Sequence, residues 1–144
     1  DIQNLPFRNK EFDIVFSRFS LMYCNNLKKV FTDIYRVLKE SGEVYLETNI
    51  ASINDQELAE KIKRQEIPLL LRVGERQIEI KNYTQTLEEY HQAIKNVGLA
   101  IEDEKIFEAE GLSLSPDYQY KDKVSFNYAV FRLIKNKARI NTNL

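Results

Sequence analysis

Two runs with strand character flank a helical stripe within the first fifty residues, and this order constrains the fold more than any other feature of the chain. Residues Asp13 to Ser17 form a short, mostly apolar run bounded by polar residues, which favours a buried parallel strand. Residues Glu43 to Asn49 alternate between apolar and polar side chains, as a strand does. Between them, apolar residues recur at helical spacing, at Leu27, Val30, Phe31, Ile34, Val37 and Leu38. This order predicts a right-handed crossover between two parallel strands.

Capping residues mark two helices. Asn26 can accept a hydrogen bond from an early amide of the first helix, and Gly42 can relax its exit. Thr86 and Glu89 have the spacing of a capping box, which predicts a second helix over 87–97 that ends at Gly98. Two later strands are predicted over 99–107 and 125–134, and the second is apolar enough to be covered on both faces.

The middle of the chain is less regular. Residues 52–65 predict a charged helix, because Glu57 and Lys61 have the i, i+4 spacing of an ion pair. Pro68 cannot continue a helix interior, and the leucines after it form a patch that must cover something apolar. We expect 72–81 to be extended.

Composition excludes several classes of protein. The 144 residues suit one domain, and 21 basic against 22 acidic side chains leave a net charge of −1, so no strong field for nucleic acid or anionic lipid is expected. The single cysteine excludes an internal disulfide framework. No apolar run approaches the roughly 20 residues that cross a bilayer. We therefore expect a cytoplasmic protein without nucleic-acid or membrane partners.

The order of motifs then resembles a known family. Asp1, Leu5-Pro6-Phe7 and Phe12-Asp13 stand in the order and spacing found before and at the fourth strand of class I S-adenosylmethionine-dependent methyltransferases, type 11-like. Arg36-Val-Leu-Lys-Glu-Ser-Gly42 resembles the turn into the next strand of that family. The likeness covers nearly the whole chain. In the family, a glycine-rich turn after the first strand and an acidic residue after the second strand grip the cofactor, and both would lie upstream of Asp1.

This resemblance implies an α/β fold. The chain would form the C-terminal part of a Rossmann-like sheet, namely its fourth to seventh strands, with flanking helices and with the last strand antiparallel and inserted between its predecessors. Residues 1–144 would be the C-terminal portion of a single methyltransferase domain, and 50–83 would be an insertion that forms a substrate lid.

The resemblance also implies a cofactor site for S-adenosylmethionine. Asp1 would accept a hydrogen bond from the adenine amino group, a role that suits a carboxylate because it only accepts. The amide of Ile2 would donate to a ring nitrogen. Ser17, Arg18 and Phe19 would face the methionine part, since ligands of open α/β sheets bind beyond the carboxyl ends of the strands.

The acceptor would be a small molecule, held by Tyr23, Arg72 and Tyr83. No catalytic residue is assigned, because methyl transfer depends mainly on holding two reactants close and aligned. His91 is the only histidine, and it lies beside the apolar stripe of the helix predicted over 87–97. This indicates a position at the border between the core and the solvent. No cysteine or histidine pair predicts a metal site.

The predicted first strand would expose an unpaired edge, and such edges pair with other chains. The resemblance thus leads us to expect a homodimer through this edge, and an isolated chain without activity. The alternative function is a non-catalytic, methyltransferase-like interaction module that binds a partner through the edge or through the patch from Pro68 to Leu71. A nicotinamide dinucleotide enzyme is a weaker alternative, because its glycine fingerprint is also absent.

Overall fold

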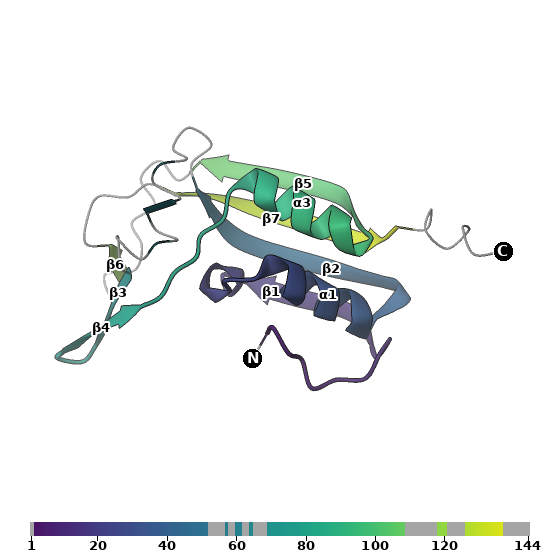
Figure 1. Cartoon of the computed structure of the whole chain (residues 1–144), viewed down its shortest axis with the longest axis horizontal. Helices are drawn as coiled ribbons and strands as arrows, with labels where there is room; N and C mark the ends of the chain where they lie inside the picture. The colour runs from purple at the N-terminus through teal and green to yellow at the C-terminus, as the bar shows by residue number, and fades with distance from the viewer. Residues whose placement is uncertain are drawn as a thin grey trace.

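The computed structural model describes residues 2–51, 57, 60, 61, 64, 69–108, 118–120 and 126–136. Its main body is a four-stranded sheet with two helices packed on one face, as Figure 1 shows. The body comprises β1 (Phe12–Arg18), a 3-10 turn η1 (Leu21–Tyr23), α1 (Leu27–Val37), β2 (Leu38–Ala51), α3 (Leu87–Val97), β5 (Leu99–Glu108) and β7 (Phe126–Lys135). A second, smaller sheet contains β3 (Leu69–Val73), β4 (Arg76–Ile80) and β6 (Tyr118–Tyr120).

The order of the four strands is β1-β2-β7-β5. β1 and β2 are parallel, and β7 is antiparallel to both β2 and β5. The predicted crossover and the insertion of the last strand between its predecessors are therefore confirmed. Because β7 alone is reversed, β1, β2 and β5 all end at the same edge of the sheet.

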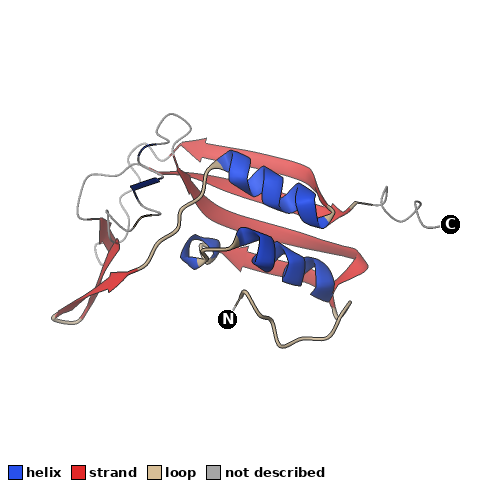
Figure 2. Cartoon of the chain, in the orientation of Figure 1, coloured by secondary structure: helices blue, strands red, loops and turns tan. Residues whose placement is uncertain are grey.

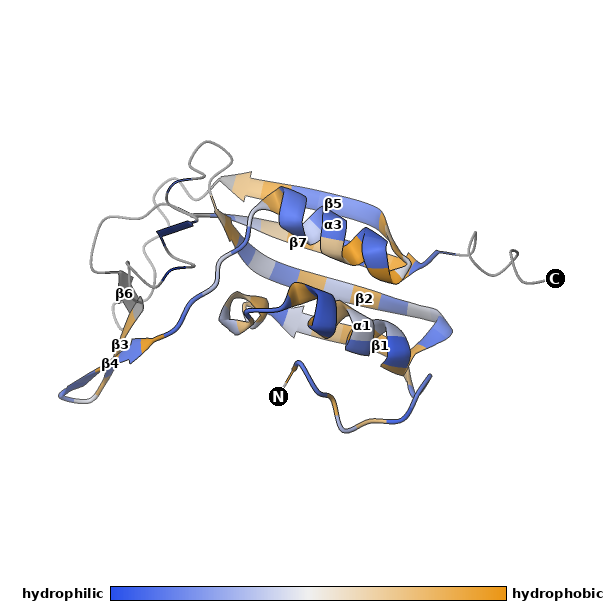
Figure 3. Cartoon of the chain, viewed as in Figure 1, coloured by the Kyte–Doolittle hydropathy of each residue, from blue (hydrophilic) through white to orange (hydrophobic). Residues whose placement is uncertain are grey.

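α1 forms because its apolar residues lie on one stripe and its first turn is capped. Asn26 Oδ1 accepts from the amide of Lys29 at 3.0 Å, as predicted. The helix ends one residue earlier than its apolar pattern indicated, since Leu38 already pairs with β1 as the first residue of β2. Hydrophobic and hydrophilic residues alternate along both helices (Figure 3).

Gly42 lies inside β2 and not at a helix exit, which corrects the sequence prediction. The register of β1 against β2 jumps here, because Phe12 pairs with Leu38 whereas Ile14 pairs with Glu43. A Cβ at Gly42 would lie 2.7 Å from Leu38 Cδ1 and 3.0 Å from the carbonyl oxygen of Asp13. Glycine is needed here for close packing of the bulge.

The capping box of α3 is present as predicted. Thr86 Oγ1 accepts from the amide of Glu89, and the Glu89 carboxylate accepts from the amide of Thr86 at 2.8 Å. The helix ends at Gly98, whose φ of 91° favours glycine. Figure 2 shows α1 and α3 side by side on the same face of the sheet.

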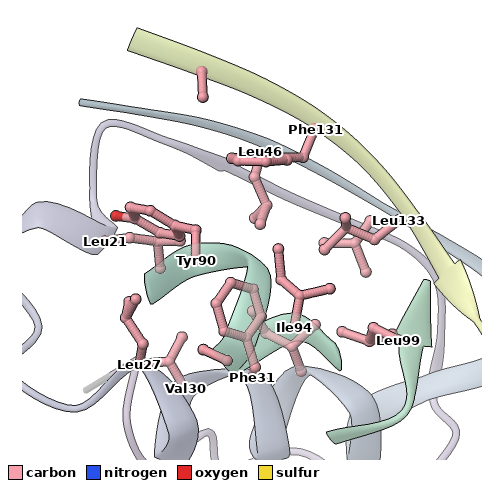
Figure 4. Close-up of a cluster of buried hydrophobic side chains, with 14 of the residues drawn as sticks. Leu21, Leu27, Val30, Phe31, Leu46, Tyr90, Ile94, Leu99, Phe131 and Leu133 are labelled. Atoms are coloured by element: carbon pink, nitrogen blue, oxygen red, sulfur yellow. The ribbon is translucent and has the colours of Figure 1, made fainter. Parts of the chain in front are cut away.

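The hydrophobic core lies between these two helices and the sheet. Figure 4 shows side chains of α1, α3 and the strands meeting in one cluster. Tyr90 packs edge-on against Phe31, with ring centroids 6.5 Å apart, and its hydroxyl lies 2.8 Å from Thr48 Oγ1. No buried side-chain polar atom of the described residues lacks a hydrogen-bond partner.

The opposite face of β1 is uncovered among the described residues. Ile14 is 62% exposed and Phe16 is 68% exposed, whereas Ser17 is buried. The prediction that 13–17 is a fully buried strand is therefore wrong. The strand is two-sided because both helices lie on one face of the sheet.

The middle of the chain departs from the prediction of one extended segment over 72–81. β3 and β4 form a hairpin in which Val73 pairs with Arg76, so Gly74 and Glu75 are its two-residue turn. Gly74 has a φ of 63°, as such turns require. β6 was not predicted. The predicted helix over 52–65 lies mostly outside the described residues, but its Glu57–Lys61 ion pair is present at 2.8 Å.

Candidate functional site

The candidate site is the edge of the sheet where β1, β2 and β5 end. Ligands of open α/β sheets bind at this edge. η1 follows β1 here, and the amide of Tyr83 donates to the carbonyl of Met22 at 2.7 Å. This hydrogen bond places the residues between β4 and α3 beside η1. Tyr83 and Tyr23 therefore lie in neighbouring segments.

The turn after β1 holds Phe19 in a conformation that large residues rarely adopt. Phe19 has a φ of 48°, which costs about 1–3 kcal/mol for a residue with a side chain. Its amide donates to the carbonyl of Glu47 at 2.7 Å, so the end of β2 fixes the turn. Ser17 is only 8% exposed, and its Oγ lies 2.5 Å from Ser20 Oγ. The two hydroxyls form a polar group at the end of β1.

Arg18 is oriented by its own chain. Its Nε lies 2.9 Å from Glu47 Oε2, and its guanidinium carbon lies 5.6 Å from the centre of the Phe19 ring. The positive charge is therefore partly compensated, but most of the side chain is exposed. Arg18 can still contact a ligand at the strand end.

A cavity of about 420 Å³ adjoins this turn. It is lined by Ile2, Ser17, Arg18 and Ser20, and it continues along β1 past Val15. Its size is in the range of small-molecule sites. The structure thus brings Ile2, Ser17 and Arg18 together at one cavity, and their role in binding a cofactor stays a prediction. Asp1 lies outside the described residues.

The residues predicted to bind the methyl acceptor do not all lie close together. Tyr23 is partly exposed in η1, beside the segment that carries Tyr83. Arg72 is exposed on β3, in a hairpin that extends away from the four-stranded sheet (Figure 1). Arg72 is therefore separate from the residues at the strand ends.

Sequence reasoning missed a row of three aromatic rings at this edge. Phe19 meets Tyr128 edge-on with centroids 6.3 Å apart, and Tyr128 stacks on Phe107 at 4.8 Å. Phe107 and Tyr128 pair across β5 and β7. The row could have been predicted only from the pairing of residues between these two strands, and the sequence alone did not specify that pairing.

His91 lies at the boundary of α3, as expected, and edge-on to Phe131. Its Nε2 lies 2.5 Å from Glu104 Oε2. Within the described residues no group of three or more histidine, cysteine, aspartate or glutamate side chains could hold a metal ion. None of the helices in that part of the chain has the length and apolar character of a membrane span.

Comparison with known proteins agrees with this geometry. Residues 1–46 match the family model described as a methyltransferase domain. A structure of an S-adenosylmethionine-dependent methyltransferase from Methanosarcina mazei superposes with a TM-score of 0.63 at 15% identity, covering 95% of this chain and 66% of that one. The chain has the fold of a class I methyltransferase.

Other proteins share this methyltransferase fold. Geranyl diphosphate C-methyltransferase from Streptomyces coelicolor A3(2), solved with Mg²⁺, geranyl diphosphate and S-adenosyl-L-homocysteine, gives a TM-score of 0.62 at 14% identity, covering 94% of this chain and 51% of that one.

Two curated relatives match the chain in sequence. A sterol 4-C-methyltransferase of Caenorhabditis elegans is 38% identical over 55 residues, which are 38% of this chain and 16% of the relative. A malonyl-[acyl-carrier protein] O-methyltransferase of Erwinia billingiae is 35% identical over 48 residues, which are 33% of this chain and 19% of the relative. The match thus spans less than a fifth of either relative.

Proposed function

We propose that this chain is the acceptor-side part of an S-adenosylmethionine-dependent methyltransferase that acts on a small molecule. The observation that carries the proposal is the turn after β1. Its strained Phe19 and its buried Ser17 lie at the strand end, beside the cavity that also reaches Ile2. Strained backbone held by surrounding structure is frequent at functional sites.

The residues around the cavity suit a nucleoside that carries an amino-acid tail. Ile2 and Leu5 offer an apolar wall for a flat base, and the Ser17–Ser20 pair offers hydroxyls for polar groups. When bound, S-adenosylmethionine supplies an electrophilic methyl group. Asp1 would accept from the adenine amino group. The Ser17 to Phe19 turn would orient the tail.

The acceptor would lie over Tyr23 and Tyr83, beside the aromatic row. These side chains would position the acceptor's nucleophilic atom and exclude water, which is the main demand of this chemistry. The similar proteins are named for acting on a sterol, on a malonyl carrier protein and on geranyl diphosphate. A net charge of −1 also gives no support for a nucleic-acid acceptor.

Residues 50–83 would act as a lid over this acceptor. In the proposal, the 144-residue chain binds donor weakly and is inactive alone, because the glycine-rich turn that the family uses to hold the donor is not among these residues. The protein would act in the cytoplasm.

The test is binding of S-adenosylhomocysteine, measured by calorimetry on the product of the open reading frame that contains this chain. Ser17→Val should weaken binding at least tenfold, which is about 1.4 kcal/mol. Ile78→Ala on the β4 strand is the control and should change nothing. Absence of binding in the unaltered protein would refute the enzyme and leave the interaction module as the function.

A further inference from the structure

The residues before β1 lie against the C-terminal end of α1 and are held there by hydrogen bonds (Figure 1). The last carbonyls of a helix have no partner within the helix itself. Here the carbonyls of Arg36 and Val37 accept from the amides of Lys10 and Glu11, both at 2.8 Å. Lys10 has a φ of 56°, so this contact fixes a left-handed turn just before β1.

Two side chains of α1 hold the backbone of Leu5. Asp33 Oδ2 accepts from the Leu5 amide at 2.5 Å, and Arg36 Nη2 donates to the Leu5 carbonyl at 2.9 Å. The two side chains also bond each other, since Arg36 Nε donates to Asp33 Oδ1 at 2.8 Å. Both polar groups of one residue are thus fixed by a single pair, which we call the Asp33–Arg36 clamp.

The clamp extends along the segment beyond Leu5. Arg36 Nη1 donates to the carbonyl of Phe7 at 2.6 Å and to Asn9 Oδ1 at 3.2 Å. A guanidinium carries five N–H donors in a rigid plane, so one arginine can hold several acceptors in fixed positions. The hydrogen bond from Arg36 also lowers the pKa of Asp33. The carboxylate is therefore ionised at neutral pH, and the clamp is a charged pair.

Hydrogen bonds matter more than packing for this segment, because most of it is exposed. Pro6, Phe7, Arg8 and Asn9 are all exposed. The Phe7 ring meets Phe12 edge-on, with centroids 4.9 Å apart. Segments with few buried apolar contacts open locally at little cost in free energy. Without the clamp, the segment would therefore lose its fixed position.

The clamped segment forms one wall of the candidate cofactor cavity. Leu5 and Phe7 line this cavity together with Ile2. Ile2 packs partly against the core, and it is three residues from Leu5, a span of at most about 11 Å. The backbone is thus held at two nearby points, and its direction at Ile2 depends on where the clamp holds Leu5.

We propose that Asp33 and Arg36 are positioning residues for the adenine of the methyl donor. They hold the backbone at Leu5 so that the amide of Ile2 meets the adenine ring. Neither Asp33 nor Arg36 lines the cavity, so both act through the segment and not by contact with the donor. The inference rests on the proposed function, which assigns the donor to this cavity.

Calorimetry with two ligands tests the inference on the product of the open reading frame that contains this chain. The ligands are S-adenosylhomocysteine and S-inosylhomocysteine, in which an oxygen replaces the adenine amino group. The unaltered protein should prefer the adenine compound at least tenfold, because an oxygen cannot donate to a carboxylate. Arg36→Gln should bind the adenine compound at least tenfold more weakly and the inosine compound equally, so that the preference disappears.

Two further variants separate the clamp from charge and from folding. Arg36→Lys should lose the preference as Arg36→Gln does, because lysine keeps the charge without the planar donors. Asp33→Asn, which replaces one carboxylate oxygen by an amino group, should lose it as well. Arg132→Gln is the matched control, since Arg132 also bonds a carboxylate twice, at 2.6 and 3.1 Å to Glu43. This control should keep the preference even where stability falls.

Hydrogen exchange of the Leu5 amide, measured by nuclear magnetic resonance, tests the clamp without any ligand. Exchange should be at least tenfold faster in Arg36→Gln and Asp33→Asn, whereas the Tyr83 amide, which donates to Met22, should keep its rate. Unchanged exchange at Leu5, or a preference for adenine retained in both variants, would overturn the inference alone. Absence of S-adenosylhomocysteine binding by the unaltered protein would overturn the proposed function, and the inference with it.

Discussion

The hydrogen bond between Thr48 and Tyr90 fastens α3 to the middle of β2, and its removal should depend strongly on which partner is changed. Thr48 Oγ1 and the Tyr90 hydroxyl oxygen are 2.8 Å apart, and both residues are fully buried. Burial raises the pKa of Tyr90 above its ordinary value, so the hydroxyl stays protonated. The Tyr90 hydroxyl therefore keeps its proton, and with it this hydrogen bond, at neutral pH.

The two single substitutions are not equivalent. Thr48→Val leaves the Tyr90 hydroxyl buried with no other partner among the described residues, which should cost about 2 kcal/mol. Tyr90→Phe removes the hydroxyl itself. Thr48 Oγ1 then still donates to the carbonyl of Asn49 at 3.3 Å, so this change should cost about 1 kcal/mol.

The double variant is the decisive one. With both polar groups gone, nothing unsatisfied remains, and the total cost should be about 1 kcal/mol where simple addition gives about 3 kcal/mol. Urea unfolding followed by circular dichroism measures all four proteins. Tyr45→Phe is a matched control on the other face of β2, where the tyrosine hydroxyl bonds Glu43 in a partly exposed position. An additive double variant would refute the reasoning.

Three other changes test the structure. Gly42→Ala would place a Cβ 2.7 Å from Leu38 Cδ1, so thermal unfolding should reveal a loss of about 1–3 kcal/mol; unchanged stability would mean that the bulge can relax. Hydrogen bonds from Arg132 and Tyr45 lower the pKa of Glu43 from 4.5 to about 2, so its stabilisation is complete above pH 4.5 and is lost as the pH falls towards 2. Glu43→Gln should flatten the pH dependence of urea midpoints in that window, and an unaltered slope would contradict this assignment. Thr86→Ala should cost about 1 kcal/mol in urea unfolding through loss of the cap, and a cost near zero would show that the capping box is dispensable.

Sequence patterns predicted those parts of the fold that depend on neighbouring residues. The Asn26 cap, the Thr86 capping box and the alternation of β2 are local features, and the structure contains all three. The strand order followed from the resemblance to a family and not from periodicity. A helix cap or an alternating run depends only on residues that are close in sequence, so it can be predicted without knowing the rest of the fold.

Features that depend on contacts between distant residues were missed. The aromatic row needs the pairing of Phe107 with Tyr128, which neither segment specifies alone. Gly42 was assigned to a helix exit because its close contact with Leu38 arises only from the register jump against β1. The strained φ of Phe19 likewise has no local signal, since the end of β2 fixes it.

The alternation of β1 separates stability from function along a single strand. Val15 packs partly against the core and Ser17 is buried, whereas Ile14 and Phe16 project from the uncovered face. Substitutions at Ile14 or Phe16 should change the free energy of unfolding little, since both side chains stay mostly exposed in the folded chain. At Ser17 stability and function meet, because its buried hydroxyl bonds Ser20 and also lines the candidate cofactor cavity.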